Sequence, residues 1–320
     1  MKRTGNIYHS ITSLANLQEA DRKARKGKLD TYGVVQHDRN QEGNLLVLQD
    51  QLGSKTYRTS TYDIFKVHEP KERIVYRLPY FPDRIAHHAI MNVLEPILVN
   101  SFTADTYSCI KKRGIHLLLN NLRHDLKDVA GTRYCLKLDI KKFYPSIDHD
   151  VLKQLLRRKF KDPDLLWLLD EIIDSAPGLP IGNYLSQYLA NFCLTYFDHW
   201  IKEEKRVKYY YRYADDIVIL DNDKPRLHSH LQEISNYLHE MKLEVKENHQ
   251  VFPVDARGID FVGYVFYHSH IRIRKAIKQN FARKLSRNPD DRSTASYLGW
   301  LGHANAKHLT KKLTTHAQLQ

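Results

Sequence analysis

The chain of 320 residues is poor in cysteine and has no long apolar run. Its three cysteines, Cys109, Cys135 and Cys193, lie far apart without a Cys-x-x-Cys spacing, which excludes a disulfide scaffold and a cysteine-based zinc site. No apolar stretch is long enough to cross a bilayer, and the basic start at 1–6 is not followed by the apolar part of a secretory signal. We therefore expect a cytoplasmic protein with no membrane partner.

Acidic residues are scarce at the C-terminal end. After Asp260, only Asp290 and Asp291 are acidic, whereas eleven residues are lysine or arginine. This surplus of nine positive charges makes up most of the net charge of +13. Such a surplus favours a polyanionic partner such as nucleic acid, although a basic stretch is in other proteins only a solvated face. The end of the chain is thus a candidate nucleic-acid clamp.

The rest of the composition is that of an ordinary globular protein, with 42% hydrophobic and 27% charged residues. The apolar spacing predicts helices at about 10–52, 83–94, 150–160, 184–201, 227–241 and from 275 onward, the second with Asp83 as its N-cap. It predicts strands within 62–80, 134–140, 209–220, 243–245, 261–266 and 270–274, and a turn at 177–182. This order is typical of an α+β fold in which helices cover one antiparallel sheet.

Three aspartates stand out because each lies next to a β-prone run. Asp215 and Asp216 are adjacent and lie between two such runs, where a strand-turn-strand would place them at the exposed tip of a hairpin. Asp139 ends a separate apolar strand. If the two strands lie side by side, Asp139 comes next to Asp215 and Asp216.

Converging carboxylates repel one another and are costly unless cations neutralise them. Mg²⁺ suits such oxygen ligands, and two ions about 4 Å apart promote phosphoryl transfer by activating an attacking hydroxyl and stabilising a leaving oxygen. An isolated Asp-Asp pair is more often a solvated turn, but the flanking strands and the independent Asp139 favour a metal site. The expected cofactor is a pair of Mg²⁺ ions, with Mn²⁺ as a substitute.

These residues also resemble a known family. The segment 213–216, Tyr-Ala-Asp-Asp, is similar to the YxDD box of reverse transcriptases. The run 138–148 resembles the first catalytic motif of that family, and 178–187 resembles the motif that lies under the template and the incoming nucleotide. Order and spacing match, as do flanking segments at 70–74 and 261–264. The resemblance covers most of the chain from about residue 60 onward.

Within the family, the sequence most resembles bacterial retroelement enzymes, above all those of diversity-generating retroelements. These share the I-G-x-x-x-S-Q pattern found at 181–187, whereas most other members have Gln in place of Ile181 and Pro in place of Gln187. The chain departs from that group at Tyr184 and Leu185, where the group usually has Leu-Thr. Reverse transcriptases of antiphage defence systems share much of the pattern, so both contexts stay open, and the gene is expected to be bacterial or phage-encoded.

The resemblance implies a right-hand polymerase fold, α+β, with an antiparallel palm sheet backed by helices and a helical thumb. It implies an N-terminal extension and fingers at 1–130, the palm with the catalytic motifs at 131–260, and a primer-grip region and basic thumb at 261–320. The implied activity is RNA-directed DNA synthesis, error-prone in the diversity-generating case. The implied partners are a structured non-coding template RNA, the cDNA in an RNA–DNA hybrid, dNTPs, and a small accessory protein or a second copy of the chain.

The resemblance also implies roles for single residues. The catalytic residues would be Asp139, Asp215 and Asp216, which would hold the two ions together with the carbonyl of Ile140. The incoming dNTP would contact Lys71, Arg73, Tyr144, Ile181, Gly182 and Gln187, with Tyr144 excluding ribonucleotides. Lys246 is a candidate general acid, and the nucleic acid would contact Gly263, Lys278, Arg283, Lys284 and Arg287.

Other interpretations stay open. An inactive RNA-binding scaffold on the same fold is one, although the three intact aspartates argue against it. An RNA-templated RNA polymerase, or a template-free or protein-primed polymerase, is another. Tyr144 favours deoxynucleotides but does not decide whether a template is used.

Overall fold

The structure of the protein is a computed structural model that describes residues 2–68, 72–287, 291–308 and 311. The chain divides into two compact units, each built from segments that are far apart in the sequence. Unit 1 comprises Met1–Thr103, Lys141–His199 and His239–Leu243, and unit 2 comprises Ala104–Ile140, Trp200–Leu238 and Glu244–Gln320. Each unit is described separately.

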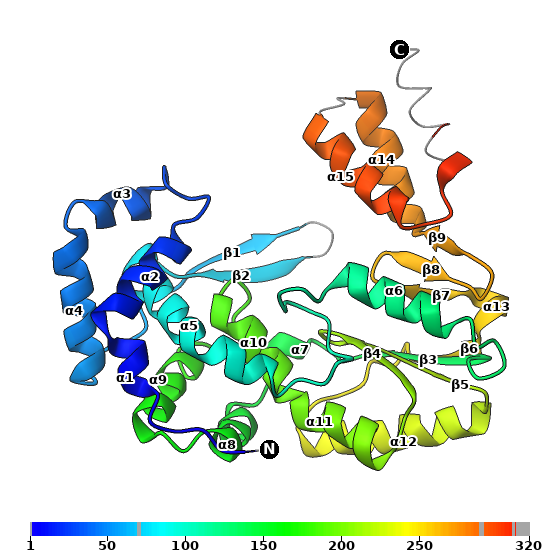
Figure 1. Cartoon of the computed structure of the whole chain (residues 1–320), viewed down its shortest axis with the longest axis horizontal. Helices are drawn as coiled ribbons and strands as arrows, with labels where there is room; N and C mark the ends of the chain where they lie inside the picture. The colour runs from blue at the N-terminus through cyan, green and yellow to red at the C-terminus, as the bar shows by residue number, and fades with distance from the viewer. Residues whose placement is uncertain (1, 69–71, 288–290, 309–310, 312–320) are drawn as a thin grey trace. The chain divides into compact units, whose positions relative to one another are not determined.

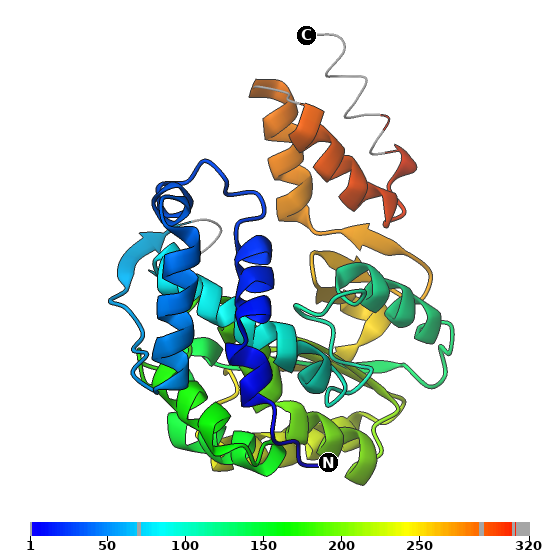
Figure 2. The same cartoon turned by 60° about the vertical axis from the view of Figure 1, so that its left-hand side comes forward.

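Unit 2 is built around a four-stranded antiparallel sheet of order β4-β5-β3-β6 (Figure 1). Its strands are β3 (Tyr134–Asp139), β4 (Tyr209–Tyr213), β5 (Asp216–Asp221) and β6 (Gln250–Pro253). Apolar side chains of β5 are buried on both faces, which explains its unbroken apolar run at 217–220. In both views, α6 (Ile115–Asp125) and α12 (Lys224–Glu240) lie on opposite sides of the sheet (Figures 1 and 2).

A smaller three-stranded antiparallel sheet follows in unit 2. It consists of β7 (Ile259–Phe261), β8 (Tyr264–Phe266) and β9 (Ile271–Ile273). Side chains of β7 and β8 join the same apolar core as those of α6, β4 and β5. The one-turn helix α13 (Val254–Arg257) precedes this sheet, and α14 (Lys275–Arg287) and α15 (Asp291–Gly302) follow it around a second, small core. The π-helix η2 (Trp200–Glu204) precedes β4.

Unit 1 is mainly helical and is centred on α5 (Ile85–Val99), which has eight buried residues. Helices α2 and α10 pack against α5. The N-terminal helices are α1 (Tyr8–Thr12), α2 (Leu14–Ala24), α3 (Tyr32–Asp38) and α4 (Gln41–Gly53). The later ones are α7 (Phe143–Ser146), α8 (His149–Lys159), α9 (Pro163–Ile173), α10 (Tyr184–Cys193) and α11 (Thr195–His199). The exposed hairpin of β1 (Asp63–Val67) and β2 (Arg73–Arg77) and the π-helix η1 (Tyr80–Arg84) lead into α5.

The α+β class is confirmed, but the prediction of one sheet is wrong, because the described residues form three sheets. The segment 261–266 is not one strand. It turns at Val262 and Gly263, whose φ angles of 42° and 92° separate β7 from β8. The segment 243–245 is also not a strand, since only Val245 makes an isolated bridge, to Ile140, and the fourth strand of the sheet is β6.

Two helix predictions also need correction. The helix expected at 184–201 is broken into α10, α11 and η2. Asp83 is not an N-cap, because it lies inside η1, which continues directly into α5. Its buried carboxylate instead accepts hydrogen bonds from the Tyr57 hydroxyl at 2.8 Å and the Ser60 amide at 3.0 Å. None of the described helices combines the length and the hydropathy needed to cross a membrane.

Candidate active site

The three aspartates meet at one end of the four-stranded sheet in unit 2. Strands β3 and β5 are antiparallel neighbours, and Asp139 stands opposite Asp216 as the terminal pair of their ladder. Asp215 lies in the tight turn between β4 and β5, and its carbonyl accepts a hydrogen bond from the Ile140 amide at 3.3 Å. The predicted juxtaposition of these aspartates is therefore confirmed by the strand register.

Burial and mutual repulsion define the electrostatics of this cluster. Asp215 and Asp216 are half-buried and not at an exposed tip as predicted. Burial, and next the Asp139 carboxylate, raise the pKa of Asp215 to about 6. Burial likewise raises the pKa of Asp216, against the opposing pull of Lys137. The fold thus holds negative charges together at a cost, which is typical of sites that bind cations.

Lys246 is fixed beside this cluster. Its ammonium nitrogen lies 2.6 Å from Oδ1 of Asp139, and its backbone amide donates to the Asp139 carbonyl at 2.9 Å. Both groups are about one-third exposed, so the pair lies at the edge of the site and within reach of solvent. The structure therefore places this candidate general acid in direct contact with one of the predicted catalytic carboxylates.

The donor set fits Mg²⁺. The cluster offers carboxylate oxygens, and the raised pKa of Asp215 indicates that nothing in the protein neutralises it fully. Among the described residues, no group of three or more His, Cys, Asp or Glu side chains forms a ready-made metal cage. A Mg²⁺ site commonly takes one or two carboxylates together with substrate phosphates and water.

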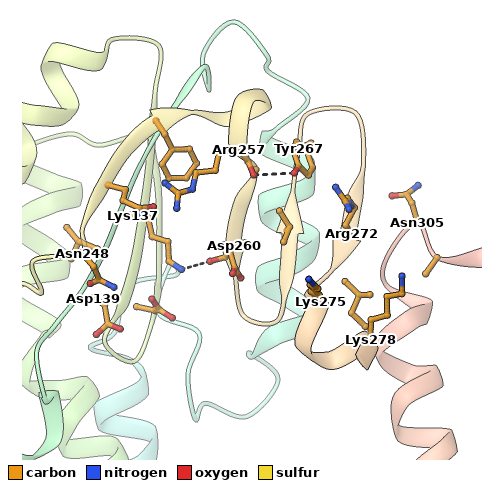
Figure 3. A pocket seen from close by; sticks show the side chains of 18 residues that line it. Lys137, Asp139, Asn248, Arg257, Asp260, Tyr267, Arg272, Lys275, Lys278 and Asn305 are labelled. Carbon is orange, nitrogen blue, oxygen red and sulfur yellow. Dashed lines mark hydrogen bonds between the residues drawn. The ribbon is translucent and has the colours of Figure 1, made fainter. Parts of the chain in front are cut away.

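A cavity of about 850 Å³ lies beside Asp139 and Asp216 within unit 2 (Figure 3). On the side of the carboxylates, Lys137 donates a hydrogen bond to the Asp260 carbonyl. Figure 3 shows basic side chains on the far wall. They come from β9 and α14 and include Arg272, Lys275 and Lys278. The wall formed by β9 and α14 is therefore basic, whereas the opposite side holds Asp139 and Asp216 together with Lys137.

The cavity includes residues that sequence reasoning missed. Arg257 and Lys137 line it but stand out in no motif, and only the basic bias after residue 260 pointed toward Arg272 and Lys275. Of the predicted nucleic-acid contacts, Lys278 lines the cavity, whereas Arg283 is exposed further along α14 and Lys284 is half-buried there. The side chain of Arg287 lies outside the described residues.

Gly263 has a packing role in the structure. Its φ of 92° is in the left-handed region, and a Cβ atom there would lie 2.5 Å from the Trp300 ring and 2.9 Å from the Ile277 side chain. The close approach that this glycine permits is thus an approach of α14 and α15 to the turn between β7 and β8. A contact with nucleic acid at Gly263 stays a prediction.

In unit 1 the structure brings other predicted residues together. The Tyr144 carbonyl accepts a hydrogen bond from the Leu179 amide at 2.8 Å, which ties α7 to the turn at 177–182. The Ile181 carbonyl accepts one from the Tyr76 amide at 2.8 Å, which ties the same turn to β2. Gly182 has a φ of 118°, and a Cβ atom there would lie 2.6 Å from the Tyr76 carbonyl oxygen.

The remaining predicted nucleotide contacts are exposed. Arg73 begins β2 opposite Val67, and Gln187 lies on the solvent side of α10. Lys71 lies outside the described residues. Tyr144, Ile181 and Gly182 are thus connected through backbone hydrogen bonds, and Arg73 lies on the strand that they contact.

Comparison with known proteins supports the resemblance to reverse transcriptases. The family model described as "Reverse transcriptase (RNA-dependent DNA polymerase)" matches residues 66–266, more than half of the chain. The chain is 24% identical over 298 residues to Protein YkfC of Escherichia coli (strain K12), covering 78% of this chain and 76% of that protein. It is 25% identical over 180 residues to Group II intron-encoded protein LtrA of Lactococcus lactis subsp. cremoris, covering 53% of this chain and 29% of LtrA.

Solved structures show the same fold. The apo telomerase of Candida tropicalis superimposes with a TM-score of 0.53 at 14% sequence identity, over 75% of this chain and 51% of the telomerase chain. This likeness shows the fold alone, a right-hand polymerase fold of the α+β class. The chain spans about half the length of that telomerase and less than a third of LtrA.

Proposed function

The chain belongs to the reverse transcriptase family of RNA-directed DNA polymerases, and from this premise we propose that it copies a dedicated, structured non-coding RNA into cDNA by two-metal phosphoryl transfer. The observation that carries the proposal is the register that sets Asp139 opposite Asp216, with Asp215 in the adjoining turn. A solvated turn gains nothing from such crowding of negative charge, whereas a cation site requires it.

In this proposal, the carboxylates of Asp139, Asp215 and Asp216 and the carbonyl of Ile140 hold two Mg²⁺ ions. The ions, when bound, supply charge stabilisation for the attacking primer hydroxyl and the leaving pyrophosphate. The Lys246 ammonium, whose nitrogen lies 2.6 Å from Oδ1 of Asp139, keeps that carboxylate in place and carries a proton beside it. That proton is available to the pyrophosphate as it leaves.

The incoming dNTP is proposed to contact residues of unit 1. Arg73 and Lys71 would bind the triphosphate, the first through a bidentate guanidinium and the second as a point charge. The Tyr144 ring would block the 2′-hydroxyl of a ribonucleotide. Ile181, Gly182 and Gln187 would line the pocket of the nascent base pair, where the Tyr76–Ile181 hydrogen bond fixes the backbone.

The RNA–DNA hybrid is proposed to lie along the basic wall of unit 2. Lysine and arginine side chains at Lys278, Arg283, Lys284 and Arg287 would bind phosphates without regard to sequence. We expect specificity to come from the structured RNA, together with a small accessory protein or a second copy of the chain. The division into fingers, palm and thumb at 1–130, 131–260 and 261–320 is kept as part of this proposal.

The element context is proposed to be a diversity-generating retroelement. Ile181 supports it, because an apolar side chain makes none of the hydrogen bonds that Gln would make, and lost pocket contacts reduce discrimination against mismatches. A reverse transcriptase of an antiphage defence system, with templated or template-free synthesis, is the alternative. An inactive RNA-binding scaffold is the alternative of a different class, and the retained carboxylate cluster argues against it.

The test is dNTP incorporation by the purified protein with Mg²⁺, on RNA that co-purifies from cells and on a primed homopolymer RNA. Wild type runs beside the double variant Asp215→Ala/Asp216→Ala, and the products are sequenced. Mg²⁺-dependent DNA copied from one RNA, and absent with the variant, is the expected result. No product on either template, with correctly folded protein and its co-purified partners present, favours the scaffold.

A further inference from the structure

A second cavity lies wholly within unit 1, where α3, η1 and the loop after α2 meet. Its volume is about 670 Å³, which is within the usual range for a small-molecule site. Three cations line it, namely Lys28, Arg77 and Arg84. The described lining contains no aspartate or glutamate. This cavity is separate from the carboxylate cluster, and the proposed polymerase activity assigns it no role.

Two of the three cations that line this cavity have no acidic partner among the described residues. Lys28 and Arg84 are half-buried, and neither forms an ion pair with a described residue. Burial lowers the pKa of both groups, and the nearby Arg84 lowers that of Lys28 further. The fold therefore keeps two partly desolvated positive charges close together. Their desolvation and mutual repulsion destabilise the folded state unless an anion binds.

Two acids of α2 and α3 are engaged by another cation. Asp21 pairs with Arg25 at 2.6 Å, and Asp38 pairs with the same arginine at 2.9 Å. Asp63 is bonded to Arg77, the only one of the three cavity cations with an acidic partner among the described residues. The positive charge that faces the cavity thus comes mainly from Lys28 and Arg84.

Aromatic and polar groups complete the lining. Tyr32 is 80% exposed and lines the cavity, so its side chain is accessible to a ligand there. Phe81 lies on the same cavity and stacks on His37, with ring centroids 5.5 Å apart. The buried Nε2 atom of His37 lies 3.6 Å from the Asp21 carboxylate, just beyond hydrogen-bond distance. Gln36 and Asn44 add amide donors and acceptors.

We propose that this cavity binds a phosphorylated nucleoside, with Lys28 and Arg84 on the phosphate and Tyr32 and Phe81 on the base. The bound unit is either a free nucleotide or one nucleotide of an unpaired RNA strand, since both present the same phosphate and base. Cations for the phosphate, an exposed aromatic ring for stacking and amides for base edges are the three components that such a ligand requires.

The test measures binding with two probes, radiolabelled ATP and an unpaired oligouridine RNA carrying 4-thiouridine, which is photocrosslinked and mapped to peptides. The protein carries Asp215→Asn so that no synthesis occurs, which keeps the result independent of polymerase activity. The variants are Lys28→Gln/Arg84→Gln, which removes the charge, and Tyr32→Ala, whose exposed side chain makes little contribution to folding. The matched control is Lys26→Gln/Arg39→Gln, two exposed cations of the same region that do not line the cavity.

We expect each test variant to weaken binding about tenfold and the control to leave it nearly unchanged. Crosslinks on peptides containing 28–37 or 77–84 that ATP does not displace identify an RNA strand as the ligand. Displacement by ATP, with ATP binding lost in the same variants, identifies a free nucleotide. The proposal is overturned if the test variants match the control, if the crosslinks map elsewhere, or if inorganic phosphate competes as well as ATP and Tyr32→Ala has no effect.

Discussion

The two units each hold like charges close together, but of opposite sign. In unit 2, Asp139, Asp215 and Asp216 meet at the end of a β ladder, and the pKa of Asp215 rises to about 6. In unit 1, Lys28 and Arg84 face one cavity, and their pKa values fall. Each region fits a ligand of the opposite sign, a divalent cation in the first and a phosphate in the second.

The difference between the regions lies in how they are built. Hydrogen bonds of paired strands hold the aspartates in a register that one residue of slip would destroy. The basic region depends on loops and on the irregular helix η1, which are positioned by tertiary contacts. Regular strands and irregular segments can therefore both hold charges of one sign close together. We expect the resulting loss of folding stability to be measurable in both regions.

The largest expected effect is on the acidic region. Asp215→Asn removes a proposed cation ligand, but it also removes a carboxylate whose pKa is raised by burial and by repulsion from Asp139. We expect dNTP incorporation to fall on the order of a thousandfold, while the melting temperature rises by several degrees. Steady-state incorporation and thermal unfolding of the same preparation check both effects. A drop in both activity and stability would show that the carboxylate is needed for folding, which contradicts our interpretation.

The next effect concerns the backbone of unit 1. Gly182→Ala introduces a Cβ atom 2.6 Å from the Tyr76 carbonyl oxygen at a φ of 118°. We expect a loss of about 1–3 kcal/mol in the free energy of unfolding, measured by urea titration. Gly299→Ala is the control, because no atom lies within 4 Å of the added Cβ and the position is helical. An equal, small change in the free energy of unfolding of both variants would show that the close contact of Gly182 with Tyr76 does not require glycine.

Lowering the pH should separate the two units, because buried His87 of α5 in unit 1 and Asp215 in unit 2 titrate with opposite effects on stability. Burial lowers the pKa of His87 to about 4. As the pH falls, His87 therefore takes up a proton near pH 6.5 in the unfolded chain but only near pH 4 in the folded chain. Stability from His87 is therefore complete above about pH 6.5 and falls as the pH drops toward 4, by about 2 kcal/mol at pH 5. Asp215 acts in the reverse sense, since the folded state takes up its proton first.

The measurement is amide hydrogen exchange at pH 7 and pH 5, corrected for intrinsic rates. Protection of α5 should decrease at pH 5, and protection of β3 and β5 should increase. His87→Leu should reduce the pH dependence of protection in α5, and Asp215→Asn should reduce it in β3 and β5. If protection of α5 and protection of β3 and β5 changed in the same direction in the wild-type protein, the predicted opposite effects of His87 and Asp215 would be refuted.

The regular part of the acidic region was predictable from the sequence. The β-prone runs around Asp139 and Asp216 are buried on both faces, so composition alone indicates strands, and two adjacent strands bring the aspartates together. The turn in 261–266 was missed because its first residue, Val262, is a β-branched residue that rarely adopts positive φ. Strand β6 has a weak sequence signal because it is short and ends in a proline at the edge of the sheet.

The irregular part of unit 1 could not be predicted in the same way. Backbone hydrogen bonds such as Leu179 to Tyr144 and Tyr76 to Ile181 have no periodic signal, so only the resemblance to a family grouped these residues. Asp83 shows the same limit, because its sequence context indicates an N-cap while tertiary hydrogen bonds from Tyr57 and Ser60 decide its position. The cavity with Lys28 and Arg84 joins segments that share no motif.

The smallest expected effect is on fidelity, and it tests whether the irregular region contributes chemistry as well as support. The Ile181 carbonyl is fixed by Tyr76, so a new side chain at this position should start from an unchanged backbone. We expect Ile181→Gln to lower the misincorporation frequency several-fold, because the amide offers hydrogen bonds that distinguish paired from mispaired bases, worth about 1 kcal/mol. Sequencing of cDNA made from one RNA template gives the frequency, with Ile181→Leu as the apolar control. Equal error rates in Ile181→Gln and wild type, at similar incorporation rates, would show that the Ile181 side chain does not contribute to base selection.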